Sequence, residues 1–120
     1  MKDYKDVTVW QRSMQLAEEI YKIVRFLPKE ELFGLSNQMK RAAVSIPSNI
    51  AEGYGRESKN DYLHFLRIAR GSLYEVETQL YLCLRIGFFE EQQTELAFSY
   101  CREIGKMLNV LLRNVQASSR

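Results

Sequence analysis

Metal ligands and reactive side chains are scarce in this sequence. It holds one histidine, His64, and two cysteines, Cys83 and Cys101, among 120 residues. A di-iron helical bundle needs paired Glu-x-x-His elements, and only Asp61-x-x-His64 comes near that pattern. A Ser/His/Asp triad would have to use the same histidine, without a nucleophile elbow beside any serine. We therefore expect no catalytic residue, no metal site and no cofactor, in a protein that is not an enzyme.

Signals for export, membranes and disulfides are also missing. The two cysteines match no CxxC spacing, so they are predicted to be small core residues in a reducing compartment. The first ten residues carry Lys2, Asp3, Lys5 and Asp6 and lack the apolar core of a secretory signal. No apolar run approaches the ~18 residues that a membrane span needs. These absences predict a cytoplasmic protein without membrane contact.

Neither sign of charge predominates in the composition. Lys and Arg number 17 against 15 Asp and Glu, which gives a net charge of +2. So small an excess does not identify a nucleic-acid-binding protein. From residue 99 onward four basic residues stand against Glu103 alone: Arg102, Lys106, Arg113 and Arg120. A solvated C-terminal turn that complements the helix dipole explains this mildly cationic segment as well as a binding site does.

Helical periodicity is the pattern that the sequence has in abundance. Apolar residues recur at helical spacing in four segments, residues 7–27, 35–54, 58–86 and 91–115. The third is the clearest, because its apolar positions keep an unbroken 4-3 spacing: Tyr62, Leu66, Ala69, Leu73, Val76, Leu80 and Cys83. No segment shows the alternation of a strand. Short joints between long helices predict one all-α domain, residues 1–120, folded as an antiparallel up-down-up-down four-helix bundle.

The ends of these helices carry local signals. Asp6 is predicted to cap the first helix and Ser58 the third. Gly53 and Gly55 are expected to end the second helix, because glycine reaches the left-handed conformations that close a helix. Gly87 is expected to end the third. The fourth helix is expected to direct five side chains toward the core: Leu96, Tyr100, Ile104, Met107 and Leu111.

The first and third helices carry more apolar surface than one bundle core uses. In the third helix Ile68, Leu82 and Ile86 lie away from the core stripe. The first helix has two apolar stripes: Val7, Trp10, Met14, Ala17, Tyr21 and Val24, and beside them Val9, Leu16, Ile20, Ile23 and Leu27. Two explanations fit, an interface between subunits or residues that lean over the rim of one core. We expect a homo-oligomer.

Basic and aromatic residues accompany each other around the joint between the second and third helices. Lys and Arg neutralise phosphates, and Tyr stacks on bases. Glu52, Glu57 and Asp61 interrupt the basic residues, so a solvated, salt-bridged face fits a single subunit as well as an RNA site does. A ring of identical subunits would repeat the patch and enlarge its field. The candidate nucleic-acid-binding residues are Lys40, Arg41, Arg56, Lys59, Arg67 and Arg70, with Tyr54 and Tyr74 nearby.

Residues 41–80 contain the most specific pattern, RAAVSIPSNIAEGYGRESKNDYLHFLRIARGSLYEVETQL. Its motif IPSNIAEG comprises Ile46, Pro47, Ser48, Asn49, Ile50, Ala51, Glu52 and Gly53. The segment resembles the signature of the four-helix-bundle protein family encoded in 23S rRNA intervening sequences, and the likeness extends more loosely over nearly the whole chain. The resemblance implies a four-helix bundle that assembles as a ring-shaped homopentamer. It implies no defined biochemical role, because the family's association with ribosomal RNA is largely one of gene location.

The same family is similar to the accessory variability determinant of diversity-generating retroelements, a pentameric bundle that binds nucleic acid and a reverse transcriptase. Those proteins are distinctly basic, whereas this chain has a net charge of +2. Two functional hypotheses follow. The first is a non-enzymatic, homo-oligomeric scaffold that binds RNA or ribonucleoprotein. The second is a protein-binding adaptor without direct nucleic-acid contact, such as a reverse-transcriptase accessory protein.

Overall fold

Four long helices make up most of the computed structural model, which describes residues 3–118. They are α1 (Thr8–Ile23), α2 (Asn37–Tyr54), α3 (Lys59–Ile86) and α4 (Glu91–Ala117). Three 3-10 turns, Tyr4–Asp6, Val24–Phe26 and Lys29–Glu31, and a π-helical turn, Leu32–Ser36, lie before α2. No strand occurs within residues 3–118. The prediction of an all-α, four-helix protein is confirmed.

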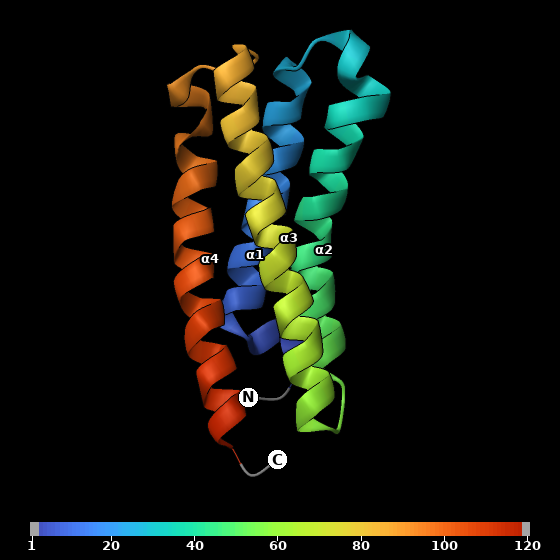
Figure 1. Cartoon of the computed structure of the whole chain (residues 1–120), viewed down its shortest axis with the longest axis vertical. Helices are drawn as coiled ribbons and strands as arrows, with labels where there is room; N and C mark the ends of the chain where they lie inside the picture. Colours follow the sequence, from blue (N-terminus) through green and yellow to red (C-terminus); the bar gives the residue numbers. More distant parts are fainter. Residues whose placement is uncertain (1–2, 119–120) are drawn as a thin grey trace.

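The helices lie side by side, and successive helices run in opposite directions (Figure 1). The connections between α1 and α2 and between α3 and α4 lie together at one end, which we call the upper end. The α2–α3 joint lies at the lower end. α1 contacts α2 and α4, and α3 contacts the same two helices, so α1 and α3 occupy opposite corners of a square. The molecule measures 48 × 24 × 21 Å.

The core forms between the facing stripes of the four helices. The heptad stripe predicted for α3, from Tyr62 to Cys83, is between 0% and 5% exposed at every position. In α1 the stripe that contains Leu16 and Ile20 enters the core, whereas Met14 and Tyr21 of the other stripe are 39% and 49% exposed. The other stripe is therefore divided, because Val7, Ala17 and Val24 are buried while Met14 and Tyr21 stay on the surface.

The core stripe predicted for α4 was wrong in part. Leu96 is 49% exposed, and the residues that α4 buries are Thr94, Ala97, Cys101, Ile104, Leu108, Leu112 and Val115. The two apolar stripes of this helix lie side by side, so periodicity alone does not choose between them. Small residues on the inward side allow a close approach to α3. A Cβ atom on Gly105 would lie 3.6 Å from Cδ2 of Leu73.

Gly53 lies within α2 and sets its distance from α3. The only positive φ among residues 3–118 belongs to Gly87, so the left-handed ending predicted for Gly53 and Gly55 was wrong. A Cβ atom on Gly53 would lie 2.9 Å from Cβ of Phe65 and 3.0 Å from Cδ1 of Tyr62. Such distances are too short for a side chain. Glycine at this position allows the lower ends of α2 and α3 to pack closely.

Replacement of Gly53 by alanine is expected to lower the free energy of unfolding by about 1–3 kcal/mol, the usual cost of overpacking a core. Gly71→Ala is the matched control, because a Cβ atom on Gly71 meets nothing within 4 Å. In the middle of a helix that change should raise stability by up to about 1 kcal/mol. Urea unfolding of both variants measures the difference. Equal stabilities would contradict the close approach of the two helices.

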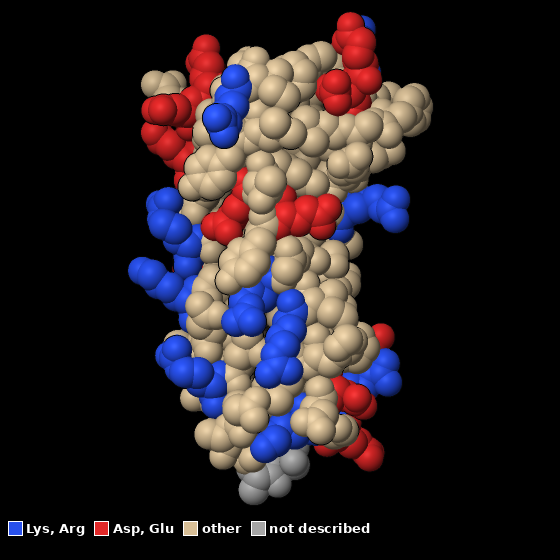
Figure 2. Space-filling view, in the orientation of Figure 1, with Lys and Arg blue, Asp and Glu red and all other residues tan. Residues whose placement is uncertain are grey.

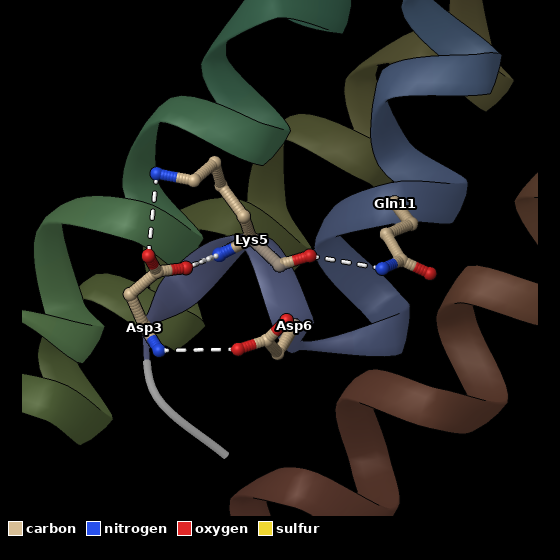
Figure 3. Close-up of polar contacts among 4 residues, drawn as sticks. All are labelled: Asp3, Lys5, Asp6 and Gln11. Carbon is tan, nitrogen blue, oxygen red and sulfur yellow. Dashed lines mark hydrogen bonds and ion pairs between the residues drawn. The ribbon is translucent and has the colours of Figure 1, made fainter.

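The first helix does not use the cap predicted for it. Val7 precedes α1 and has no capping side chain. Asp6 instead closes the preceding turn, where its carboxylate accepts a hydrogen bond from the Asp3 amide at 3.4 Å (Figure 3). In that turn the Lys5 amide donates to the Asp3 carboxylate at 2.8 Å, and Gln11 donates to the Lys5 carbonyl at 2.9 Å (Figure 3). The prediction for Asp6 was wrong because an additional turn precedes the helix.

The signals at both ends of α3 are confirmed. The Ser58 hydroxyl accepts a hydrogen bond from the Asp61 amide at 3.3 Å, which satisfies one of the free amides of the first turn. Gly87 follows the last residue of α3 with φ 92°, a conformation that glycine adopts without steric cost. These ends fix the length of the helix that carries much of the candidate site.

Candidate nucleic-acid interface

Basic side chains gather over the lower half of the face that α3 and α4 form, whereas acidic side chains lie over the upper half, down to a band just above mid-height, and beside the α2–α3 joint (Figure 2). On α4 the spacing of Arg102, Lys106 and Arg113 places them on one helical stripe. On α3 three of the four basic residues lie in the first half of the helix, and the fourth, Arg85, lies in its last turn at the upper end. We call the combined set the α3/α4 basic surface: Lys59, Arg67, Arg70, Arg102, Lys106 and Arg113.

Two contacts between α3 and α4 bring the basic residues of the two helices together. Arg70 Nη1 donates to Asn109 Oδ1 at 3.1 Å, and Asn109 lies on the α4 stripe between Lys106 and Arg113. Lys59 Nζ donates to the carbonyl oxygens of Gln116 and Ser118, each at 3.1 Å. The start of α3 is thus tied to the end of α4. Residues about 40 to 60 positions apart in the sequence share one surface.

No carboxylate neutralises the α3/α4 basic surface within residues 3–118. The ion pairs of this part of the chain join Lys5 to Asp3, Arg12 to Glu103 and Arg56 to Glu52. Glu103 is the one acidic residue among 99–118, and its partner is Arg12 of α1. The basic residues of α4 therefore form no ion pair within residues 3–118, although Arg102 borders a hollow that Glu91 and Glu95 also line.

Lys40 and Arg41 do not join the other four predicted site residues. They lie near the start of α2, about 21 Å along the helix from Tyr54 at roughly 1.5 Å per residue. Lys40 Nζ lies 5.1 Å from the ring centroid of Tyr21. Arg41 borders a small hollow between α2 and α3 that Glu75 also lines. The predicted cluster of six around the joint is therefore divided, because helical rise separates residues that are close in sequence.

Arg56 lies at the α2–α3 joint but is already engaged. Its guanidinium is 3.4 Å from the Glu52 carboxylate and 5.0 Å from the ring centroid of Phe65. Tyr54 is half-buried and meets Tyr62 edge to face, with ring centroids 6.2 Å apart. At the joint itself, the basic residue therefore belongs to a salt-bridged surface, which was the alternative to an RNA site. Lys59, Arg67 and Arg70 belong to the basic surface beside it.

Sequence reasoning did not include Arg102, Lys106 and Arg113 in the site. Their spacing of four and seven residues was a usable signal, since it places three cations on one helical stripe. The composition of the C-terminal segment already showed the excess of charge. The sequence did not show that this segment lies beside Arg67 and Arg70, because that proximity depends on how α4 packs against α3.

Two apolar grooves flank α1 on neighbouring sides of the bundle. The α1/α2 groove has a volume of about 690 Å³. Its apolar lining includes Trp10, Met14, Tyr21, Val44 and Pro47. The α1/α4 groove has a volume of about 460 Å³ and is lined by Val7, Val9, Met107, Val110 and Leu111, among others. The grooves expose apolar side chains such as Met14, Val44 and Val110 beside buried core residues such as Val9.

The motif IPSNIAEG has a structural role at each position. Ile46 and Ile50 are fully buried in the core. Asn49 Nδ2 donates to the Ser45 carbonyl at 2.7 Å. Glu52 pairs with Arg56, and Gly53 allows α3 to approach. The remaining three residues, Pro47, Ser48 and Ala51, line the α1/α2 groove. The motif thus shapes a helix junction and a groove.

The two cysteines lie in the core of the bundle. Burial raises the pKa of Cys83 to about 11 and that of Cys101 to about 12. Both thiols therefore stay protonated, and both are core residues as predicted. Residues 3–118 contain no group of three or more His, Cys, Asp and Glu side chains that could hold a metal ion. Within the same range, none of the helices combines the length and apolar content that a bilayer crossing demands.

Comparisons with known proteins agree with the resemblance in the motif. A family model described as 23S rRNA-intervening sequence protein matches residues 5–110. Among solved structures, the chain is similar to a protein with unknown function from the S23 ribosomal protein family of Bacteroides thetaiotaomicron, with 31% sequence identity and a TM-score of 0.82. That similarity covers 91% of this chain and 98% of the other. No curated protein sequence matches. The chain belongs to the 23S rRNA-intervening sequence protein family.

Proposed function

We propose that the protein is a non-enzymatic, cytoplasmic, homo-oligomeric scaffold that binds RNA or ribonucleoprotein through the α3/α4 basic surface. The observation that carries the proposal is the set of six cations on one face, none of which has a carboxylate partner within residues 3–118. Cations that neutralise phosphates release condensed counterions, which is the main source of sequence-independent affinity. Tyr74 is 54% exposed and shares a helical stripe with Arg67, so its ring is available for base stacking.

Assembly is the second part of the proposal. The α1/α2 and α1/α4 grooves are unlike apolar surfaces on adjacent sides of the square. Adjacent sides face about 90° apart, and a closed ring of five needs about 108° between the two contacts of each subunit. This geometry favours a small ring, and we propose the pentamer that the family resemblance implies. In such a ring α1 faces the axis, and the α3/α4 basic surface lies on the outside.

A ring also explains how a subunit of small net charge can hold RNA. Each subunit has a net charge of only +2, but its basic residues are concentrated on one face. Rotation about the ring axis repeats that face around the perimeter. The repeated fields add, and one RNA can contact several subunits. The weak charge of the single chain is therefore compatible with useful affinity.

Native mass spectrometry of the wild-type protein, with and without a structured RNA, tests this proposal. We expect a ring of five 14.1 kDa subunits, and a second species heavier by the mass of the RNA. If the ring takes up no RNA at low salt, the RNA-binding proposal is wrong and the protein-adaptor hypothesis is favoured instead. A 14.1 kDa monomer at low micromolar concentration would contradict the assembly.

A further inference from the structure

Exposed tyrosine rings follow one stripe of α3 beside the basic surface. Tyr74 and Tyr81 are 54% and 57% exposed, and Arg67 precedes them on the same stripe at the same interval in sequence. Each interval spans about 10.5 Å along the helix. Arg70 lies on the side of α3 that faces α4, where it donates to Asn109. The two rings therefore continue the line of basic residues toward the upper end.

Tyr81 also forms one wall of a hollow between α3 and α4. Its ring lies against that of Phe98, with the centroids 4.7 Å apart and an angle of 43° between the ring planes. Phe98 packs against the core and so holds the Tyr81 ring in place. The hollow has a volume of about 490 Å³, and its lining also includes Leu84, Glu95 and Arg102. A ring that is already fixed beside a hollow loses little conformational entropy when a base stacks on it.

Charges of both signs surround this hollow and nearly cancel. The charged residues that line it, or lie within one helical turn of a lining residue, are Glu77, Glu90, Glu91, Glu95 and Glu103 against Arg85, Arg102 and Lys106. Glu103 is paired with Arg12 of α1. The balance that remains attracts neither a phosphate nor a cation strongly, which suits an uncharged aromatic group. Arg102 belongs both to this hollow and to the α3/α4 basic surface, so the hollow continues that surface.

We infer that the α3/α4 basic surface binds unpaired RNA, and that the unpaired bases stack on Tyr74 and on the Tyr81–Phe98 pair beside the hollow. The inference rests on the proposed RNA binding and specifies its ligand. In an A-form duplex the bases are stacked on one another, so this surface meets mainly phosphates and sugars. A single strand or a loop can turn its bases outward, and each base that stacks on a ring raises the affinity about fivefold or more.

A labelled RNA strand without self-complementarity, and the duplex that it forms with its complement, test this preference. Fluorescence anisotropy with the intact wild-type assembly measures both affinities at the same salt concentration. Electrostatics alone favours the duplex, because its phosphates are more densely spaced. We expect the single strand to bind about tenfold more tightly, through stacking. Equal affinities, or tighter binding of the duplex, overturn the inference and leave the basic surface as an RNA site. Binding of neither RNA overturns the proposed function as well.

Variants locate the stacking site on the protein. Tyr74→Leu with Tyr81→Leu removes both rings and keeps side chains that favour a helix. This variant should bind the single strand about tenfold or more weakly and should bind the duplex as wild type does. Phe26→Leu with Phe33→Leu is the matched control, since these rings are 61% and 87% exposed outside the α3/α4 basic surface, and it should leave the affinity for the single strand unchanged. Equal affinities of the two variants for the single strand overturn the inference.

Discussion

Replacement of Arg67, Arg70, Arg102 and Arg113 by glutamine is expected to lower the affinity for RNA about 30-fold or more, at roughly 0.5–1 kcal/mol for each exposed arginine–phosphate pair that is removed. None of these four side chains makes an ion pair within residues 3–118. Their removal therefore leaves no carboxylate unpaired, and the fold should remain stable. Lys106 is kept because it borders the α1/α4 groove. Anisotropy titrations with labelled RNA measure the decrease in affinity.

The matched control replaces Arg25, Lys29, Lys40 and Arg41 by glutamine. It lowers the net charge of +2 by the same four units, but the changes lie outside the α3/α4 basic surface. Lys40 and Arg41 were also part of the site predicted from sequence, so the control separates the two versions of the site. We expect a decrease of threefold or less, from the weak long-range field alone. An equal decrease in both variants would show that total charge, rather than this surface, binds RNA.

Glutamate at Met14 and Val44 is expected to dissociate the proposed ring. Both residues line the α1/α2 groove, where a neighbouring subunit would bury the new carboxylates. An unpaired buried carboxylate costs several kcal/mol, and the cost recurs at every interface of the ring. The subunit itself should stay folded, because these side chains are already 39% and 41% exposed. Analytical ultracentrifugation at low micromolar concentration should show monomers with unchanged helicity.

Glutamate at Ile68 and Leu82 provides the control for that experiment. These residues are 38% and 45% exposed on α3, nearly the same as Met14 and Val44, and in the proposed ring they face outward. The control should keep the ring. Dissociation of the control, with an intact ring in the groove variant, would place the interface on α3, along the second apolar stripe of that helix.

Local patterns in the sequence were sufficient for most of the helix boundaries. The unbroken stripe from Tyr62 to Cys83 needs only helical geometry, and it is buried throughout. Ser58 and Gly87 act through contacts within a few residues, so both could be predicted from their neighbours. The prediction that Asp6 caps the first helix was wrong, because one more turn precedes α1. Elements that depend on nearby residues were thus the most predictable.

Features that depend on the packing of distant segments were predicted less well. The choice between the two stripes of α4 depends on its rotation against α1 and α3. Gly53 was predicted to end α2, whereas its role arises from the close contact with Phe65 and Tyr62 on the next helix. The basic site combines Arg70 with residues near Asn109, a pairing that no local pattern contains. Helix periodicity could have placed Arg102, Lys106 and Arg113 on one stripe, but their position beside the basic residues of α3 followed only from the fold.

The salt dependence of RNA affinity tests the central claim most directly. Wild type and the variant that lacks Arg67, Arg70, Arg102 and Arg113 would be titrated with structured and single-stranded RNA at several salt concentrations. Affinity should fall linearly on a double-logarithmic plot, with a slope of about 0.7–0.9 per neutralised phosphate. The variant should show a slope lower by about that amount for each phosphate that it no longer neutralises. If wild type shows no binding at low salt, or both proteins give the same slope, the α3/α4 basic surface does not bind RNA.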